Sequence, residues 1–292
     1  MRTRQITAAL AVAATALATP AAAQEAPAAA GRQQRPLLEA GIVGGGGWLP
    51  DYPAAEQNHW RGVVAPFLIY RGELLRSDEQ GMRGRLYRAR DLELNLSLGG
   101  AFRASSRDNR AREGMPDLDW IGELGPGLRW EAWRDPAARR RLTLEVPLRA
   151  VFSTDFSQIR YRGFTFAPEV AFEQYGLFRP GSRARISIGP VFGSGRYMDY
   201  FYRVEGEFAR PGRPAYNAKG GYLGTRAQFS YRLPVTERLS LVAGGRLENF
   251  SGASNADSPL YKREFNATLV GGVSFSLYRS ATMVDSGAEP FD

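Results

Sequence analysis

The only histidine of the chain, His59, is the first residue to test for catalytic chemistry. A serine hydrolase needs a histidine beside a serine and a polar group that orients the imidazole ring. His59 lies instead next to Trp60 in an expected loop at 49–60. Nothing in the sequence places a serine and an orienting polar group around it. The chain has no cysteine, which excludes thiolate catalysis, disulfides and a lipidated cysteine.

Six glutamates form the second set of residues that could take part in catalysis, because two carboxylates close together can act as general acid and base. They fall on the polar faces of predicted strands, where they could converge inside a barrel. The alternative, which we favour, is that they pair with arginines on neighbouring strands and fill the interior with a charge-balanced network that narrows any pore. The glutamates are Glu93, Glu123, Glu145, Glu169, Glu173 and Glu248, and the arginines are Arg129, Arg149, Arg185, Arg226 and Arg246.

Neither a metal nor a phosphate site is predicted. Asp117, Asp119 and Asp257 lack the regular spacing of a calcium-binding loop. The run Gly44–Gly47 is not followed by Lys-Ser/Thr, so it indicates close strand packing or a bend rather than a phosphate loop. We predict no cofactor and no enzymatic activity. A lipid- or peptide-cleaving enzyme that uses Glu93 or the three aspartates is the least favoured function.

The N-terminus indicates where the chain acts. Two arginines precede a short apolar run at 6–17, and Ala21–Ala23 follows with small residues. This is the pattern of a secretory signal peptide, and the apolar run is shorter than the roughly 20 residues that a membrane-spanning helix needs. We expect cleavage after Ala23 and a flexible periplasmic segment at 24–35.

The charge does not indicate a nucleic-acid partner. The formal net charge is +8, and nearly all basic residues are arginines, with lysine only at 219 and 262. They are scattered at alternating positions, whereas a nucleic-acid-binding protein shows a concentrated basic face or a known module. Arginines on an inner wall or near charged lipid headgroups explain the excess, so we expect outer-membrane lipid and lipopolysaccharide as surroundings and no nucleic acid.

The elements that must position these side chains are strands. From Pro36 to Arg279 apolar and polar residues alternate with period two, as in Leu-Glu-Leu-Asn-Leu-Ser-Leu-Gly at 92–99 and Leu-Thr-Leu-Glu-Val-Pro-Leu-Arg at 142–149. Runs of about nine or more residues suit a tilted strand that crosses a bilayer, which takes about 9–11. Lipid cannot hydrogen-bond an open sheet edge, so such strands must close into a barrel.

The connections alternate between short and long, as they do in outer-membrane barrels, whose short turns are periplasmic and whose long loops are extracellular. The resulting prediction is an all-β protein, a closed antiparallel transmembrane β-barrel at 36–279 with a polar tail at 280–292. About 12 strands are predicted if the segment 61–88 breaks into three short strands, with 10 as the alternative. The predicted long loops are 49–60, 103–119, 153–160, 195–217 and 251–263.

A secreted soluble β-sandwich is the main structural alternative, because its strands show similar periodicity. The signal peptide, the strand length and the alternation of turns argue against it together. Aromatic residues near many strand ends also suit the interfacial girdle of a membrane barrel. They are Trp48, Trp60, Trp130, Trp133, Phe152, Tyr161, Tyr175, Phe250 and Tyr278.

The loop residues carry a resemblance to a known family. Tyr197–Val204 followed by Arg213–Gly221 is similar to the long-loop signature of the MipA/OmpV family of MltA-interacting proteins. Asn255–Leu260 resembles the late motif of that family, and Asp51–Pro53 fits its first loop. The resemblance covers about residues 36–279. One departure is the polar tail after Tyr278, because family members usually stop at an aromatic closing strand.

The resemblance implies an outer-membrane barrel named for a member that scaffolds a murein-degrading transglycosylase and a murein synthase. It offers no catalytic residue. The leading hypothesis is therefore a non-enzymatic scaffold for periplasmic murein-processing enzymes, and the alternatives are a narrow channel for small solutes or a surface-exposed adhesion or stress-response barrel. The loop residues that could order the 195–217 loop or contact a ligand are Tyr197, Tyr200, Tyr202, Tyr216, Asp257 and Ser258.

Overall fold

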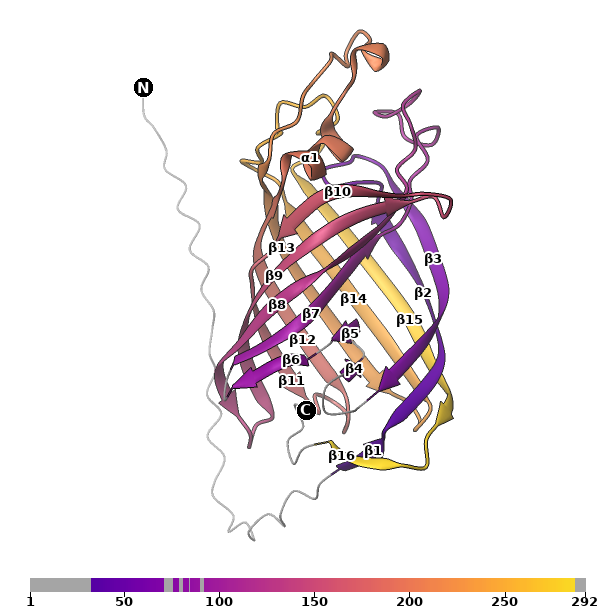
Figure 1. The fold of residues 1–292 in the computed structure, drawn as a ribbon, viewed down its shortest axis with the longest axis vertical. Coiled ribbons are helices and arrows are strands. Elements are labelled where there is room, and N and C mark those ends of the chain that lie inside the picture. The colour runs from indigo at the N-terminus through magenta and orange to yellow at the C-terminus, as the bar shows by residue number, and fades with distance from the viewer. Residues whose placement is uncertain (1–32, 71–75, 79–80, 84, 90–91, 287–292) are drawn as a thin grey trace, which may run out of the picture. The chain divides into compact units, whose positions relative to one another are not determined.

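The computed structural model describes residues 33–70, 76–78, 81–83, 85–89 and 92–286. The predicted signal peptide at 1–23 lies outside them, as does most of the 24–35 segment. Most of the described strand residues belong to one antiparallel sheet of tilted strands (Figure 1). No helix in the described part of the chain has the length and apolarity needed to cross a bilayer.

The strands follow one another around the sheet in chain order, and the last long strand pairs with the first, over Arg279–Leu269 against Glu39–Trp48 (Figure 1). This arrangement is the predicted antiparallel β-barrel. Its strands are β2 (Leu38–Pro50), β3 (Asn58–Tyr70), β6 (Arg85–Ala89), β7 (Leu92–Ala101), β8 (Trp120–Asp135), β9 (Arg140–Thr154), β10 (Ile159–Phe166), β11 (Glu169–Tyr175), β12 (Arg183–Gly193), β13 (Gly221–Pro234), β14 (Leu239–Asn249) and β15 (Phe265–Arg279).

The strand count agrees with the prediction of about 12. β10 and β11 share one position in the wall, because both pair with β9 on one side and with β12 on the other. Between β3 and β6 lies the hairpin of β4 (Arg76–Asp78) and β5 (Gly81–Arg83), whose Cα atoms come within 8 Å of β3 and β7 respectively. The segment 61–88 is thus broken into short strands as expected.

The two faces of the sheet are inverted relative to a soluble protein. On β8 the outward-facing Leu128 and Trp130 are 40% and 48% exposed, whereas Arg129 between them points inward and is 9% exposed. Apolar side chains therefore cover the outer surface and charged side chains fill the interior. Such a surface is stable only against hydrocarbon, because a continuous exposed apolar belt would aggregate in water.

The glycine run in β2 allows neighbouring strands to approach closely. Gly45 and Gly46 pair with Gly272 and Gly271 of β15, and Gly46 also pairs with Gly62 of β3. A Cβ atom on Gly45 would lie 2.9 Å from the carbonyl oxygen of Gly271, so a larger residue would push the backbones apart. The predicted close packing is confirmed, and the run lies within a strand with no adjacent helix.

The two ends of the barrel differ. The long connections, with the helix α1 (Gly195–Tyr202) and the short 3₁₀ helix η1 (Gly206–Phe208), gather at one end, which the loop lengths assign to the extracellular side (Figure 1). At the other end β1 (Gln33–Pro36) pairs with β16 (Met283–Ser286). The ordered structure therefore extends beyond the predicted range of 36–279, into both the lead segment and the tail.

Most predicted girdle residues lie on the outward face near strand ends. Trp48 and Trp60 form an edge-to-face pair with ring centroids 6.0 Å apart. Two predictions are wrong. Phe250 is 1% exposed inside the extracellular loops, and the hydroxyl of Tyr175 points inward and donates to Glu173. Both residues have the parity of an inward-facing neighbour, Tyr175 that of Glu173 and Phe250 that of Glu248, so the alternation itself argues against a girdle position.

Candidate functional site

Glu173 is the centre of the charged interior. Its side chain is fully buried on β11, where cross-strand pairing brings it opposite Arg141 of β9 and Arg185 of β12. The Nε atom of Arg141 donates to the carboxylate at 2.7 Å, Arg183 at 2.7 Å and Arg129 at 3.2 Å. A buried carboxylate requires such compensation, because its desolvation otherwise costs several kcal/mol.

The same network continues along the barrel wall. Arg185 bridges Glu169 at 2.7 Å and Glu145 at 3.2 Å, and Arg129 lies 3.6 Å from Glu145. These residues come from β8, β9, β11 and β12. The predicted ion-pair network is confirmed in this part of the wall.

Two further predicted pairs lie nearer the extracellular end. Arg149 lies 3.3 Å from Glu123, and Arg226 lies 2.9 Å from Glu248. The sequence interpretation missed Arg141 and Arg183 as partners of Glu173. Alternation placed Arg141 on the polar face, but the choice of partner depends on strand register.

His59 occupies a different environment from the predicted loop. It belongs to the start of β3, and its Nδ1 lies 2.7 Å from Oδ1 of Asp51, which also pairs with Arg61. The amide of Asn109 donates to the other carboxylate oxygen of Asp51 at 2.7 Å. The imidazole therefore helps to fix a buried carboxylate, and no serine hydroxyl is among its hydrogen-bond partners in the described residues.

The extracellular loops interlock into a cap over the barrel. The hydroxyl of Tyr52 donates to the carbonyl of Leu260 at 2.8 Å, and the hydroxyl of Tyr202 donates to the carbonyl of Pro53 at 2.9 Å. Ser258 in turn donates to the carbonyl of Tyr202 at 2.8 Å. Three loops far apart in the sequence are therefore joined by buried side chains, and we call this assembly, residues 51–57, 102–119, 194–220 and 250–264, the loop cap.

The fourth loop of the cap is attached through arginines. Arg112 is buried and donates to the carbonyl of Phe201 at 3.2 Å. At the loop tips Arg213 donates to the carbonyls of Ala111, at 3.0 Å, and Glu113, at 2.8 Å. Arginine suits this role because its planar group presents five donors in fixed directions.

A small hydrophobic core holds the loop cap together. Burial raises the pKa of the hydroxyls of Tyr52 and Tyr202 well above the ordinary value, as expected for rings removed from water. The members from the cap are Tyr52, Ala54, Ala55, Ala104, Ala111, Leu118, Tyr197, Met198, Phe201, Tyr202, Val204, Phe250, Ala253 and Leu260.

The six predicted loop residues are divided by the structure. Tyr202 and Ser258 lie in the core of the cap, as described above, and Tyr200 accepts a hydrogen bond from the backbone of Asp119 at 2.6 Å. The hydroxyl of Tyr216 donates to Asn255 at 3.2 Å. Of the remaining two, Tyr197 is buried and Asp257 is exposed on the surface.

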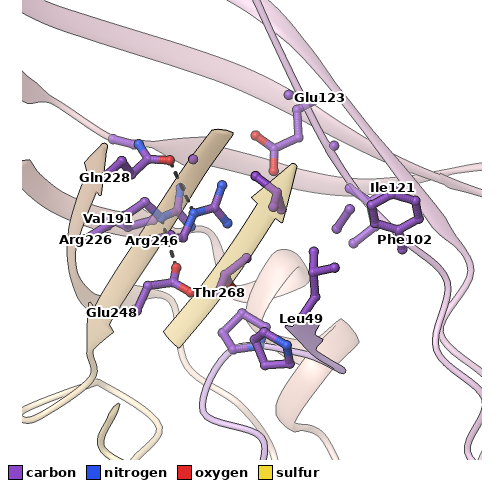
Figure 2. Close-up of a pocket in the computed structure, with 18 of the residues that line it drawn as sticks. Leu49, Phe102, Ile121, Glu123, Val191, Arg226, Gln228, Arg246, Glu248 and Thr268 are labelled. Carbon is purple, nitrogen blue, oxygen red and sulfur yellow. Dashed lines mark hydrogen bonds and ion pairs between the residues drawn. The ribbon is translucent and has the colours of Figure 1, made fainter. Parts of the chain in front are cut away.

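A cavity of about 570 Å³ lies between the loop cap and the luminal side chains. Figure 2 shows Arg226, Arg246 and Glu248 on one side of it and Phe102 and Ile121 on the other. Tyr197 and Phe201 of α1 also line it. Charged residues therefore line both sides of the cavity, with Glu123 near Ile121, and apolar side chains lie opposite Arg246 (Figure 2). The sequence interpretation did not identify this combination.

Comparison with known protein families decides the assignment. The sequence matches the family described as MltA-interacting protein MipA over residues 42–277. The chain belongs to the MipA family. The three motifs that carried the resemblance lie in the loop cap of this MipA-family barrel, apart from Gly221, which begins β13. There Tyr52, Tyr202, Tyr216 and Ser258 join one loop to another.

Solved structures show only distant similarity. A bacterial polysaccharide outer-membrane secretin is 11% identical, with a TM-score of 0.40 over 84% of this chain and 99% of the other. The NanC porin is 10% identical, with a TM-score of 0.38 over 81% and 100%. The toluene transporter TbuX of Ralstonia pickettii is 6% identical, with a TM-score of 0.24 over 87% and 71%. No curated protein matches the chain in sequence.

Proposed function

We propose that this MipA-family barrel is a non-enzymatic outer-membrane anchor for periplasmic murein-processing enzymes. The family is described by its interaction with MltA, which supports a murein-degrading partner, and a murein synthase is the second expected partner. Outward-facing apolar and aromatic side chains support contact with outer-membrane lipid and lipopolysaccharide as the surroundings of this anchor.

The observation that carries the proposal is the loop cap. An open diffusion pore needs a free lumen, but here four extracellular loops share one hydrophobic core above the luminal cavity. Four of the six loop candidates, Tyr200, Tyr202, Tyr216 and Ser258, make hydrogen bonds that support the loop-ordering role. The short turns at the opposite end are the surface available to a periplasmic protein.

Two exposed phenylalanines provide a matched test. Phe178, in the periplasmic turn between β11 and β12, is 91% exposed, and Phe156, in the extracellular loop between β9 and β10, is 82% exposed. Both have positive φ angles, of 66° and 71°, which asparagine tolerates well. Affinity-tagged wild-type, Phe178→Asn and Phe156→Asn barrels would be crosslinked in intact cells, solubilised and examined by mass spectrometry.

The expected result is enrichment of a murein hydrolase and a murein synthase with the wild type and with Phe156→Asn, and a reduction with Phe178→Asn. Enrichment of neither enzyme with the wild type, at normal barrel expression, would contradict the anchor. Equal loss with both variants would indicate a general folding defect, which heat-dependent migration in gels would reveal.

A narrow channel for small solutes is the second candidate, and the luminal cavity favours it. Its charged wall would select solutes by charge, as rings of charged side chains do in other pores. Planar-bilayer recording of the purified protein tests this function. A conductance that rises when Leu260→Ala loosens the loop cap would support a gated channel, and no conductance in either protein would exclude it.

A further inference from the structure

One arginine of the luminal cavity forms no ion pair with any residue that the structure describes. Among the charged residues that line it, Glu248 pairs with Arg226 and Glu123 pairs with Arg149. In the same way Asp51 pairs with Arg61, Glu169 with Arg185, and Asp119 lies 3.9 Å from Arg162. Within the described part of the chain, Arg246 lies in no ion pair, and its Nε atom donates to the side-chain carbonyl of Gln228 at 3.2 Å.

Strand register explains why Arg246 is unmatched. On β14 it lies directly opposite Gln228 of β13 and Thr268 of β15, and neither residue carries a charge. Figure 2 shows Arg246 directed into the cavity beside Gln228. A guanidinium group held in a membrane barrel without a carboxylate is costly unless another anion compensates it. Its two terminal nitrogens form a fork that matches a carboxylate.

The side of the cavity opposite Arg246 carries apolar side chains next to charged groups that already form ion pairs, such as Glu123 with Arg149. Leu49, Phe102 and Ile121 supply the apolar side chains here (Figure 2), and Phe201 of α1 also lines the cavity. The volume of about 570 Å³ falls within the range of pockets that bind small molecules, about 300–1,000 Å³. An inorganic anion would leave most of this space and the apolar side chains of Leu49, Phe102 and Ile121 without contacts, so the cavity suits an anion attached to an apolar body.

Tyr197 supplies a second polar group. It lines the cavity from α1, and its hydroxyl makes no hydrogen bond with the described residues. Burial raises the pKa of this hydroxyl, and the charges of Glu123, Arg226 and Glu248, which also line the cavity, act on it. A neutral hydroxyl can donate to a carboxylate oxygen.

We infer that the cavity under the loop cap is a binding site for a small organic carboxylate with an apolar body, held by Arg246 and the hydroxyl of Tyr197. The apolar wall of Leu49, Phe102 and Ile121 contacts the body of this ligand. The inference is independent of the proposed anchor role, because the cavity lies inside the lumen beneath the loop cap, whereas a periplasmic enzyme would bind the short turns at the other end.

The test uses isothermal titration of the full-length barrel in detergent with three probes. Benzoate carries the charge and the apolar body, benzamide carries the body without the charge, and acetate carries the charge without the body. Arg246→Gln removes the guanidinium, and Tyr197→Phe removes only the hydroxyl. Arg238→Gln is the matched control, because Arg238 is exposed in the turn just before the same strand.

Benzoate is expected to bind the wild type and Arg238→Gln equally, with benzamide and acetate at least about tenfold weaker. Arg246→Gln should weaken benzoate binding by about tenfold or more, the loss expected for a charge-assisted hydrogen bond, and Tyr197→Phe by about threefold or more.

Benzoate binding no tighter than that of benzamide would overturn the role of the charge, and acetate binding as tightly as benzoate would overturn the role of the apolar wall. If a folded Arg246→Gln barrel binds benzoate with wild-type affinity, Arg246 does not hold the ligand. If that variant does not fold, the comparison of Tyr197→Phe with the wild type decides: unchanged benzoate affinity then overturns the site. None of these outcomes bears on enzyme capture by the opposite end.

Discussion

Replacing Glu173 by glutamine should destabilise the barrel more than any other single change of charge in its wall. The substitution keeps the shape of the side chain but removes the negative charge that four guanidinium groups share within 4 Å. Arg129 and Arg185 retain Glu145 as a partner, whereas Arg183 has no other carboxylate within ion-pair distance among the described residues.

The expected loss of unfolding free energy follows from the burial of Glu173 and its arginine partners. Removing one partner of a buried ion pair costs about 3–5 kcal/mol, because the remaining charge stays desolvated and uncompensated. The four contacts of Glu173 are not additive, since they share one carboxylate and two of the arginines keep other partners. We therefore expect the free energy of unfolding to fall by about 3–5 kcal/mol, rather than by four times that amount.

Urea unfolding of the barrel in lipid vesicles, followed by tryptophan fluorescence, measures this change. The control is Glu237→Gln, whose carboxylate is 93% exposed and lies 3.5 Å from Arg279; its loss should cost less than about 1 kcal/mol. Adding Arg183→Gln to Glu173→Gln should recover part of the stability, because one uncompensated charge disappears. A loss below about 1 kcal/mol for Glu173→Gln would refute the buried network as a source of stability.

Three further predictions concern the loop cap. Leu260→Ala removes a fully buried side chain and should weaken the packing of the cap by about 2–5 kcal/mol, seen as faster protease cleavage of the loops on intact cells. Arg213→Ala should expose the loop tips to the same protease without changing barrel unfolding, because its bonds join only loops. Gly163→Ala should loosen α1 and speed amide exchange in this helix. Gly163 has a φ of 98°, and an added Cβ atom would clash with the Ser194 hydroxyl that caps the helix. Slower amide exchange in α1 would contradict this.

The sequence predicted the wall of the barrel because a strand in a membrane has only two environments. Alternation at 92–99 and 142–149 separates the lipid face from the lumen regardless of how strands pair, and it predicted the interior glutamates and arginines correctly. The positions of turns and long loops followed from where the alternation stops. Fold, strand number and the sides of the barrel therefore depend on local patterns that a single sequence contains.

Partners inside the lumen could not be predicted in the same way. A register shift of two residues keeps every side chain on its face but changes the residue opposite it. Glu173 thus faces Arg141 in the observed register, and the same periodicity would permit another arginine. The unmatched state of Arg246 has the same origin, because it depends on pairing with Gln228 and Thr268 and is invisible in the composition.

The interior of the barrel is divided, and the division decides what the lumen can do. The described luminal arginine–glutamate pairs extend from β8 to Glu248 on β14, whereas the luminal positions Val242, Gly244 and Val270 on β14 and β15 are small or apolar. Charges that compensate one another across neighbouring strands stiffen one half of the wall and leave no group free for a ligand. In the other half the small luminal side chains leave space inside the barrel. Arg246 lies where the two halves meet, so it faces the cavity under the loop cap without an ion-pair partner among the described residues.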